Sequence, residues 1–153
     1  EPSAAFLDHT IAVAQLAVDL RTHHHQVDVL DLETEPGCWR SFTEGFGITR
    51  TLRPDLYVSL GVGEYEHRWF IEIDRGTESV PTVITKCRTY QSYWQTGAEQ
   101  RHHGIFPKVL WVTPHQRREH LLQVGITRAR RRARISFAQN RRWPLASASP
   151  WSR

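Results

Sequence analysis

The segment 53–93 constrains the fold of this chain most strongly, because it contains two strand-like runs followed by a helix-like run. The strand-like runs are 56–60 and 67–74, and the glycine-containing sequence GVGEYE joins them. Short runs rich in β-branched and aromatic residues around such a linker are typical of neighbouring strands. Asp55, preceded by Pro54, stands at the start of the first run. We therefore expect a pair of strands with a carboxylate directly before the first strand.

The second run places two more carboxylates on one face. Side chains alternate along a strand, so one face carries Trp69, Ile71 and Ile73, and the other carries Phe70, Glu72 and Asp74. Two like charges this close favour a divalent metal, a basic partner or a solvated edge. If the neighbouring strand brings Asp55 alongside, the three carboxylates form a hard-oxygen ligand set suited to Mg²⁺ or Mn²⁺.

A helix is predicted directly after these carboxylates. Ser79 or its neighbour can cap its start, and the first turn tolerates Pro81. The core spacing is occupied by Val83, Cys87, Tyr90 and Trp94. Lys86 lies about two turns in, where it could reach back toward Glu72 and Asp74. On spacing alone, an exposed helix lysine is the alternative.

The first strand supplies one further carboxylate. Glu33 and Glu35 lie two residues apart at the end of the run 27–32 and could share a face. Glu35 could be an extra metal ligand, could pair with Arg40, or could be a solvated carboxylate at the end of a strand.

The rest of the chain completes an α/β pattern. We expect helices at 4–21 and 114–123, a loop or short turn at 38–51, a polar loop at 95–104 and a strand at 108–113. The first helix would bury Leu7, Ile11, Ala14 and Val18, and the basic stretch 125–138 would pass from a helix end into a last strand. This order predicts a mixed sheet covered by helices on both faces.

Charge points to an anionic partner. The chain carries a net charge of +4 and has a pI near 9.5. The C-terminal quarter concentrates the positive charge in Arg128, Arg130, Arg131, Arg132 and Arg134, followed by Arg141 and Arg142. We expect the group from 128 to 134 to bind DNA through its phosphates.

The length and the cysteines of the chain indicate its number of domains and its cellular compartment. A chain of 153 residues fits one domain with a core of its own, which we place at 1–139, followed by a loose basic tail at 140–153. Cys38 and Cys87 form no CxxC pair, so a reducing cytoplasm is expected. No apolar run or signal peptide favours a membrane. The chain has no Met, so we expect a fragment or processed product, and an N-terminal DNA-binding domain could precede it.

The order αβββαβ, with Pro54–Asp55 before one strand and Glu72-Ile73-Asp74 at the end of the next, resembles the PD-(D/E)xK, or restriction-endonuclease-like, superfamily. More narrowly, RPDLYVSL, WFIEIDRGTES, KCRTYQSYW and FPKVLWVT look like the replication-relaxation family of bacterial plasmid and mobile-element proteins. The resemblance covers about residues 5 to 125. It implies a restriction-endonuclease-like core and DNA as substrate, with plasmid replication or mobilisation proteins as further partners.

The resemblance also implies a metal-dependent phosphodiester site. Asp55 would match the first acidic residue of the motif and Glu72 the second, and together they would hold Mg²⁺. Asp74 stands where the motif has lysine. In parts of the superfamily that lysine migrates to the following helix, where Lys86 is the candidate. Its role would be to orient the attacking hydroxide and to stabilise the charged phosphate.

Three functions follow from these observations. The first is metal-dependent cleavage or nicking of DNA in plasmid replication. The second is a non-catalytic module that binds DNA or regulates replication with the same fold. The third is a small basic interaction protein whose acidic cluster is structural. Arginine contacts to phosphates would serve both DNA functions, and dependence on a metal separates them.

Overall fold

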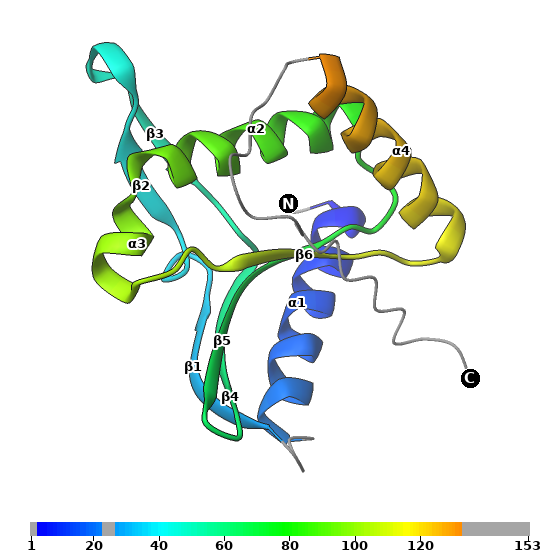
Figure 1. Cartoon of the computed structure of the whole chain (residues 1–153). Coiled ribbons are helices and arrows are strands. Elements are labelled where there is room, and N and C mark those ends of the chain that lie inside the picture. Colours follow the sequence, from blue (N-terminus) through cyan, green and yellow to red (C-terminus); the bar gives the residue numbers. More distant parts are fainter. Residues whose placement is uncertain (1–2, 23–26, 133–153) are drawn as a thin grey trace.

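In the computed structural model, which describes residues 3–22 and 27–132, a four-stranded mixed sheet forms the centre of the molecule (Figure 1). Its strands are β1 (Asp28–Thr34), β4 (Leu56–Val62), β5 (Tyr65–Ile73) and β6 (Lys108–Val112), in the order β1-β4-β5-β6. The pairs β1–β4 and β4–β5 are antiparallel, and β6 is parallel to β5. The sequence prediction of an α/β fold with a mixed sheet is confirmed.

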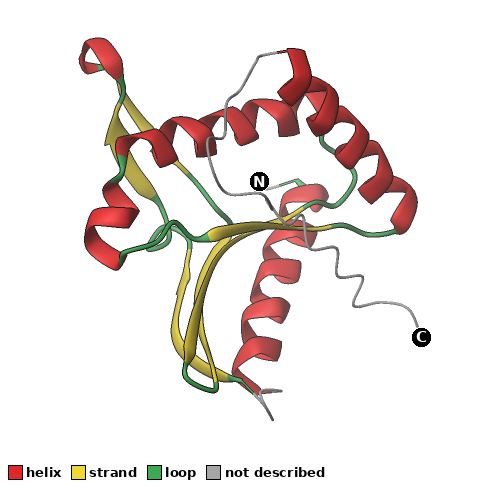
Figure 2. Ribbon diagram, in the orientation of Figure 1, coloured by secondary structure: helices red, strands yellow, loops and turns green. Residues whose placement is uncertain are grey.

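Helices cover both faces of the sheet (Figure 2). Helix α1 (Ala4–Thr22) packs on one face, and α2 (Val80–Thr96) and α4 (Gln116–Arg132) pack on the other. The predicted start of α2 is confirmed, because the Ser79 hydroxyl oxygen accepts a hydrogen bond from the Thr82 backbone N–H at 3.3 Å. The helix ends at Gly97, whose φ of 68° favours glycine.

Strand alternation divides the core into two layers. Leu56, Val58 and Ile71 face α1, where Ala17 packs against them. Tyr57 and Phe70 face α2, and Phe70 lies at the centre of an aromatic cluster that contains Tyr57, Tyr90, Tyr93 and Phe106. The predicted alternation of β5 is therefore confirmed, and it turns Glu72 toward α2.

Two segments that we predicted as loops are structured. A hairpin of β2 (Arg40–Thr43) and β3 (Thr49–Leu52), with the 3-10 helix η1 (Gly45–Gly47) at its tip, occupies the segment 38–51. The short helix α3 (Ala98–His103) occupies most of 95–104. Contacts between residues far apart in the sequence stabilise the hairpin, because the ring centroids of Phe42 and Tyr93 lie 5.2 Å apart. In α3, Glu99 accepts a hydrogen bond from the Tyr93 hydroxyl.

The last helix is longer than predicted. We expected a helix to end near residue 123 and the basic stretch to pass into a strand, but α4 continues to Arg132. Arginine and alanine both favour helix, so local propensity explains the extension. The remainder of the predicted strand and the tail at 140–153 lie outside the described residues.

The predicted core face of α1 is wrong. Leu7, Ile11 and Val18 are exposed, Ile11 by 65%, while Leu16, Ala17 and Leu20 pack against the sheet. The helix carries apolar residues on more than one of its faces, so periodicity alone does not identify which face is buried. None of the helices in the described part of the chain is long and apolar enough to cross a membrane.

Candidate functional site

Three carboxylates are buried where β4 begins and β5 ends. Asp55 is 5% exposed, Glu72 2% and Asp74 6%. The backbone N–H of Asp55 donates to the Ile71 carbonyl at 3.1 Å, and Asp55 Oδ2 accepts from the Ile73 N–H at 2.6 Å. Asp55 therefore extends the β4–β5 ladder by one residue, and this fixes its side chain beside the end of β5.

Two side chains of α2 donate hydrogen bonds to Glu72. Its Oε1 accepts a hydrogen bond from the Tyr90 hydroxyl at 2.6 Å, and its Oε2 accepts one from Lys86 Nζ at 3.2 Å. Burial raises the pKa of Glu72 to about 7, although Lys86 lowers it, and the nearby charge of Asp55 raises it further. Asp55 contacts the backbone of Ile71 and of Ile73, the two residues on either side of Glu72, and both carboxylates are buried.

Lys86 lies at the solvent-facing side of this pair. Its side chain is 37% exposed, and its Nζ also lies 3.1 Å from Glu78 Oε1. Burial lowers the pKa of Lys86, but the Glu72 and Glu78 carboxylates raise it by more, so the ammonium keeps its proton at neutral pH. This contact confirms the Glu72 part of the prediction that Lys86 reaches back toward Glu72 and Asp74. The cation that contacts Asp74 is Arg118 instead.

Asp74 is held by an arginine from a distant part of the chain. Arg118 Nε donates to Asp74 Oδ2 at 2.7 Å and Nη2 donates to Oδ1 at 3.3 Å, while the Gly76 N–H donates to Oδ1 at 2.6 Å. Arg118 also donates to the Glu78 carbonyl at 2.6 Å and is itself buried. Both oxygens of Asp74 are thus occupied by a bidentate ion pair that closes α4 onto the end of β5.

His9 adds a contact from the opposite face of the sheet. Its Nε2 lies 3.1 Å from Asp55 Oδ1, and its side chain is 32% exposed. Asp55 therefore touches α1 through His9 and β5 through the Ile73 N–H, so it links the two layers of the core.

Glu35 stands apart from these contacts. It is exposed in the turn after β1. Arg40 pairs with Glu33 at 2.8 Å and with Glu99 at 3.1 Å, so the expected alternative of a Glu35–Arg40 pair is wrong.

The predicted metal site would lie among these carboxylates. Within residues 3–22 and 27–132, no group of three or more His, Cys, Asp or Glu side chains is arranged to hold a metal ion. Mg²⁺ is commonly held by one or two carboxylates, with water and substrate phosphate in the remaining positions. Asp55 and Glu72 are the two carboxylates that would meet this smaller requirement, and each of their oxygens contacts a protein group in the structure. The four-residue ligand set of Asp55, Glu72, Asp74 and Glu35 stays a prediction.

Three residues at the site were not predicted from the sequence. Tyr90 lies four residues after Lys86, so it shares a helix face with that lysine; this spacing was a signal, although Tyr90 was assigned to the core alone. His9 and Arg118 are 46 and 44 residues from the carboxylates that they contact, and no local pattern indicates contacts at that range.

The predicted DNA-binding arginines lie on or beyond α4. Arg128 and Arg130 are exposed, and Arg131 and Arg132 belong to the last turn of the helix. Arg134 lies outside the described residues.

Comparison with known proteins identifies the family of this chain. The replication-relaxation family model matches residues 1–109, which include Asp55, Glu72, Asp74, Lys86 and Tyr90. No curated protein and no solved structure matches the chain significantly. The placement in the PD-(D/E)xK superfamily therefore stays a prediction.

Proposed function

Because the chain belongs to the replication-relaxation family, we propose that it acts on DNA in plasmid replication or relaxation, and that its reaction is metal-dependent cleavage or nicking of a phosphodiester bond. One observation carries the reaction: a protonated, partly exposed lysine lies 3.2 Å from a buried glutamate that is coupled to a second buried carboxylate. A cation beside paired carboxylates at a solvent-accessible point is suited to phosphate chemistry.

Each residue of the proposed site has its own task. Asp55 and Glu72 would hold Mg²⁺ or Mn²⁺. When bound, such an ion lowers the pKa of a water molecule and offsets the charge that develops on the phosphate. Tyr90 fixes the orientation of Glu72 through its hydroxyl. Lys86 would orient the attacking water and stabilise the negative charge on the phosphate oxygens.

The contacts of Lys86 allow it to change partners. Its Nζ lies between Glu72 and the partly exposed Glu78. A DNA phosphate that enters the site can therefore accept from Lys86 while Glu78 still balances the ammonium, which frees Glu72 Oε2 for a metal ion. Asp74 is not part of this proposed set, because Arg118 occupies both of its oxygens.

The test is cleavage of supercoiled and single-stranded DNA with Mg²⁺ or Mn²⁺. We expect the native chain to cleave and Glu72→Gln to lose the activity while it still binds DNA. The matched control is Glu66→Gln, the same substitution at the exposed end of the same strand, which is expected to leave cleavage unchanged. If the native chain does not cleave either substrate with either ion, or if Glu72→Gln cleaves as well as the native chain, the proposed reaction is wrong.

A second function is favoured by a different observation. All six oxygens of Asp55, Glu72 and Asp74 have protein donors or a histidine within hydrogen-bond distance. A carboxylate cluster satisfied in this way also suits a module that holds DNA without cutting it. Salt-sensitive DNA binding without cleavage, in the native chain and in Glu72→Gln alike, would support this alternative.

A further inference from the structure

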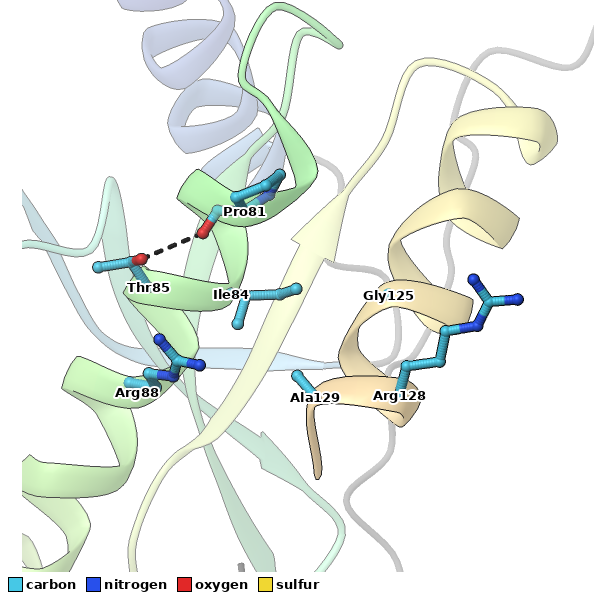
Figure 3. Close-up of a pocket in the computed structure, with 7 residues that line it drawn as sticks. All are labelled: Pro81, Ile84, Thr85, Arg88, Gly125, Arg128 and Ala129. Atoms are coloured by element: carbon cyan, nitrogen blue, oxygen red, sulfur yellow. Dashed lines mark hydrogen bonds between the residues drawn. The ribbon is translucent and has the colours of Figure 1, made fainter. Parts of the chain in front are cut away.

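Helices α2 and α4 approach each other closely at one point. A Cβ atom built on Gly125 of α4 would lie 2.4 Å from Val80 Cγ1 of α2, a distance that no real side chain tolerates. Glycine at 125 therefore lets the two helices touch near the start of α2. Next to this contact the helices leave a groove of about 600 Å³ (Figure 3). Its lining consists of Pro81, Ile84, Thr85, Arg88, Gly125, Arg128 and Ala129.

The lining of the groove combines apolar residues with one cation from each helix. Arg88 belongs to α2 and Arg128 to α4, and both side chains are exposed. Neither arginine lies within 4.0 Å of a carboxylate in the described part of the chain, in contrast to Arg40 and Arg118. Among residues 3–22 and 27–132, no acidic side chain lines the groove. The charge of both guanidinium groups is thus available to an external anion.

We propose that this groove binds the backbone phosphates of DNA, with Arg88 and Arg128 as the contacts from its two helices. This inference rests on the proposed function for the identity of the anion and adds the surface that takes it. The guanidinium group matches phosphate through two parallel N–H donors. The lining offers little to read bases, because the Thr85 hydroxyl already donates to the Pro81 carbonyl at 3.1 Å. The groove is suited to positioning DNA without choosing its sequence.

The groove and the carboxylate site both use helix α2. Thr85 and Lys86 are adjacent on α2, so one turn of the helix supplies a groove residue and the lysine of the carboxylate site. DNA held in the groove lies next to that turn. The sequence pointed to Arg128 as part of a DNA-binding group, whereas Arg88 is isolated in the sequence and becomes a candidate only because α4 packs beside it.

The test measures DNA affinity as a function of salt concentration for Arg88→Gln, Arg128→Gln and the double variant. Loss of one phosphate contact is expected to reduce the slope of log K against log salt by about 0.9, and loss of two by about 1.8. Each single variant should bind duplex DNA on the order of fivefold more weakly at low salt. The matched control is Arg21→Gln, an exposed arginine at the end of α1, whose affinity and slope should equal those of the native chain.

The outcomes separate this inference from the proposed function. Reduced slopes in both groove variants support the groove, whether or not the native chain cleaves DNA. Native slopes in both variants would overturn it even if cleavage and its loss in Glu72→Gln are observed. Equal weakening by Arg21→Gln would also overturn it, because the effect would then follow net charge alone. Failure of the native chain to bind any DNA at low salt would overturn both proposals.

Discussion

Two regions at the end of β5 use the same chemistry in different ways. Glu72 and Asp74 lie two residues apart on the same face, and each carboxylate contacts a cation. The cation at Glu72 is Lys86, with a 37% exposed side chain and a single contact to it, whereas the cation at Asp74 is Arg118, with a 9% exposed side chain and two contacts. A flexible, accessible lysine can exchange partners, while a buried bidentate arginine holds a fixed position. Neighbouring carboxylates on one face therefore need not share one role.

The largest expected effect concerns the Asp74 region. Arg118→Ala should lower the free energy of unfolding by about 3–5 kcal/mol, because it leaves the Asp74 carboxylate buried without its partner. Urea denaturation followed by circular dichroism measures this difference. The double variant Asp74→Leu/Arg118→Leu is expected to recover most of the loss. A loss below about 1 kcal/mol in the single variant would show that the ion pair does not hold α4 in place.

The next effect concerns the Glu72 region and falls on activity. Lys86→Met should reduce DNA cleavage by about 100-fold, the usual consequence of removing one donor to a charged transition state. Its free energy of unfolding should fall by less than that of Arg118→Ala, because Lys86 is partly exposed and Glu72 keeps the hydrogen bond from the Tyr90 hydroxyl. Single-turnover cleavage and urea denaturation on the same preparations measure the two quantities. A variant that loses stability but not activity would reverse the roles that we assign to the two regions.

A smaller effect is expected for the second donor to Glu72. Tyr90→Phe should lower the free energy of unfolding by about 1.5 kcal/mol, because it removes a buried hydroxyl from a buried carboxylate. Thermal or urea unfolding measures the change. Tyr65→Phe is the matched control, since Tyr65 is 74% exposed and its substitution should have no effect. Equal stabilities for the two variants would mean that the Tyr90 hydroxyl does not support Glu72.

The smallest effect concerns Glu78, which contacts both regions. Its carboxylate pairs with Lys86, and its backbone carbonyl accepts from Arg118. Glu78→Gln should lower the free energy of unfolding by only about 0.5 kcal/mol, since it removes a partly exposed ion pair and keeps the carbonyl. Urea denaturation against Glu64→Gln, an exposed glutamate in the β4–β5 turn, provides the comparison. A loss as large as that of Arg118→Ala would show that the two regions act as one unit.

Local patterns were sufficient to predict the elements around the site. Strand alternation indicated that Glu72 and Asp74 share a face, the Ser79 cap indicated the start of α2, and helical spacing allowed Lys86 to reach Glu72. The partner of Asp74 could not be predicted, because Arg118 arrives from a helix 44 residues later in the chain. The β2–β3 hairpin was missed for a similar reason: Phe42 is ordered by packing on Tyr93, which lies far from it in the sequence.

The contact between Gly125 and Val80 has a consequence for how the sequences of related proteins can vary. One atom added at position 125 would meet Val80 at 2.4 Å, so the two positions are expected to change together. A relative with alanine at the position of Gly125 should carry a smaller residue at the position of Val80, because the spacing of the two helices is otherwise lost. Gly125 lies seven residues after Arg118 and three before Arg128. Natural selection on that spacing would therefore preserve both the buried ion pair and the groove through one pair of positions that carries no charge of its own.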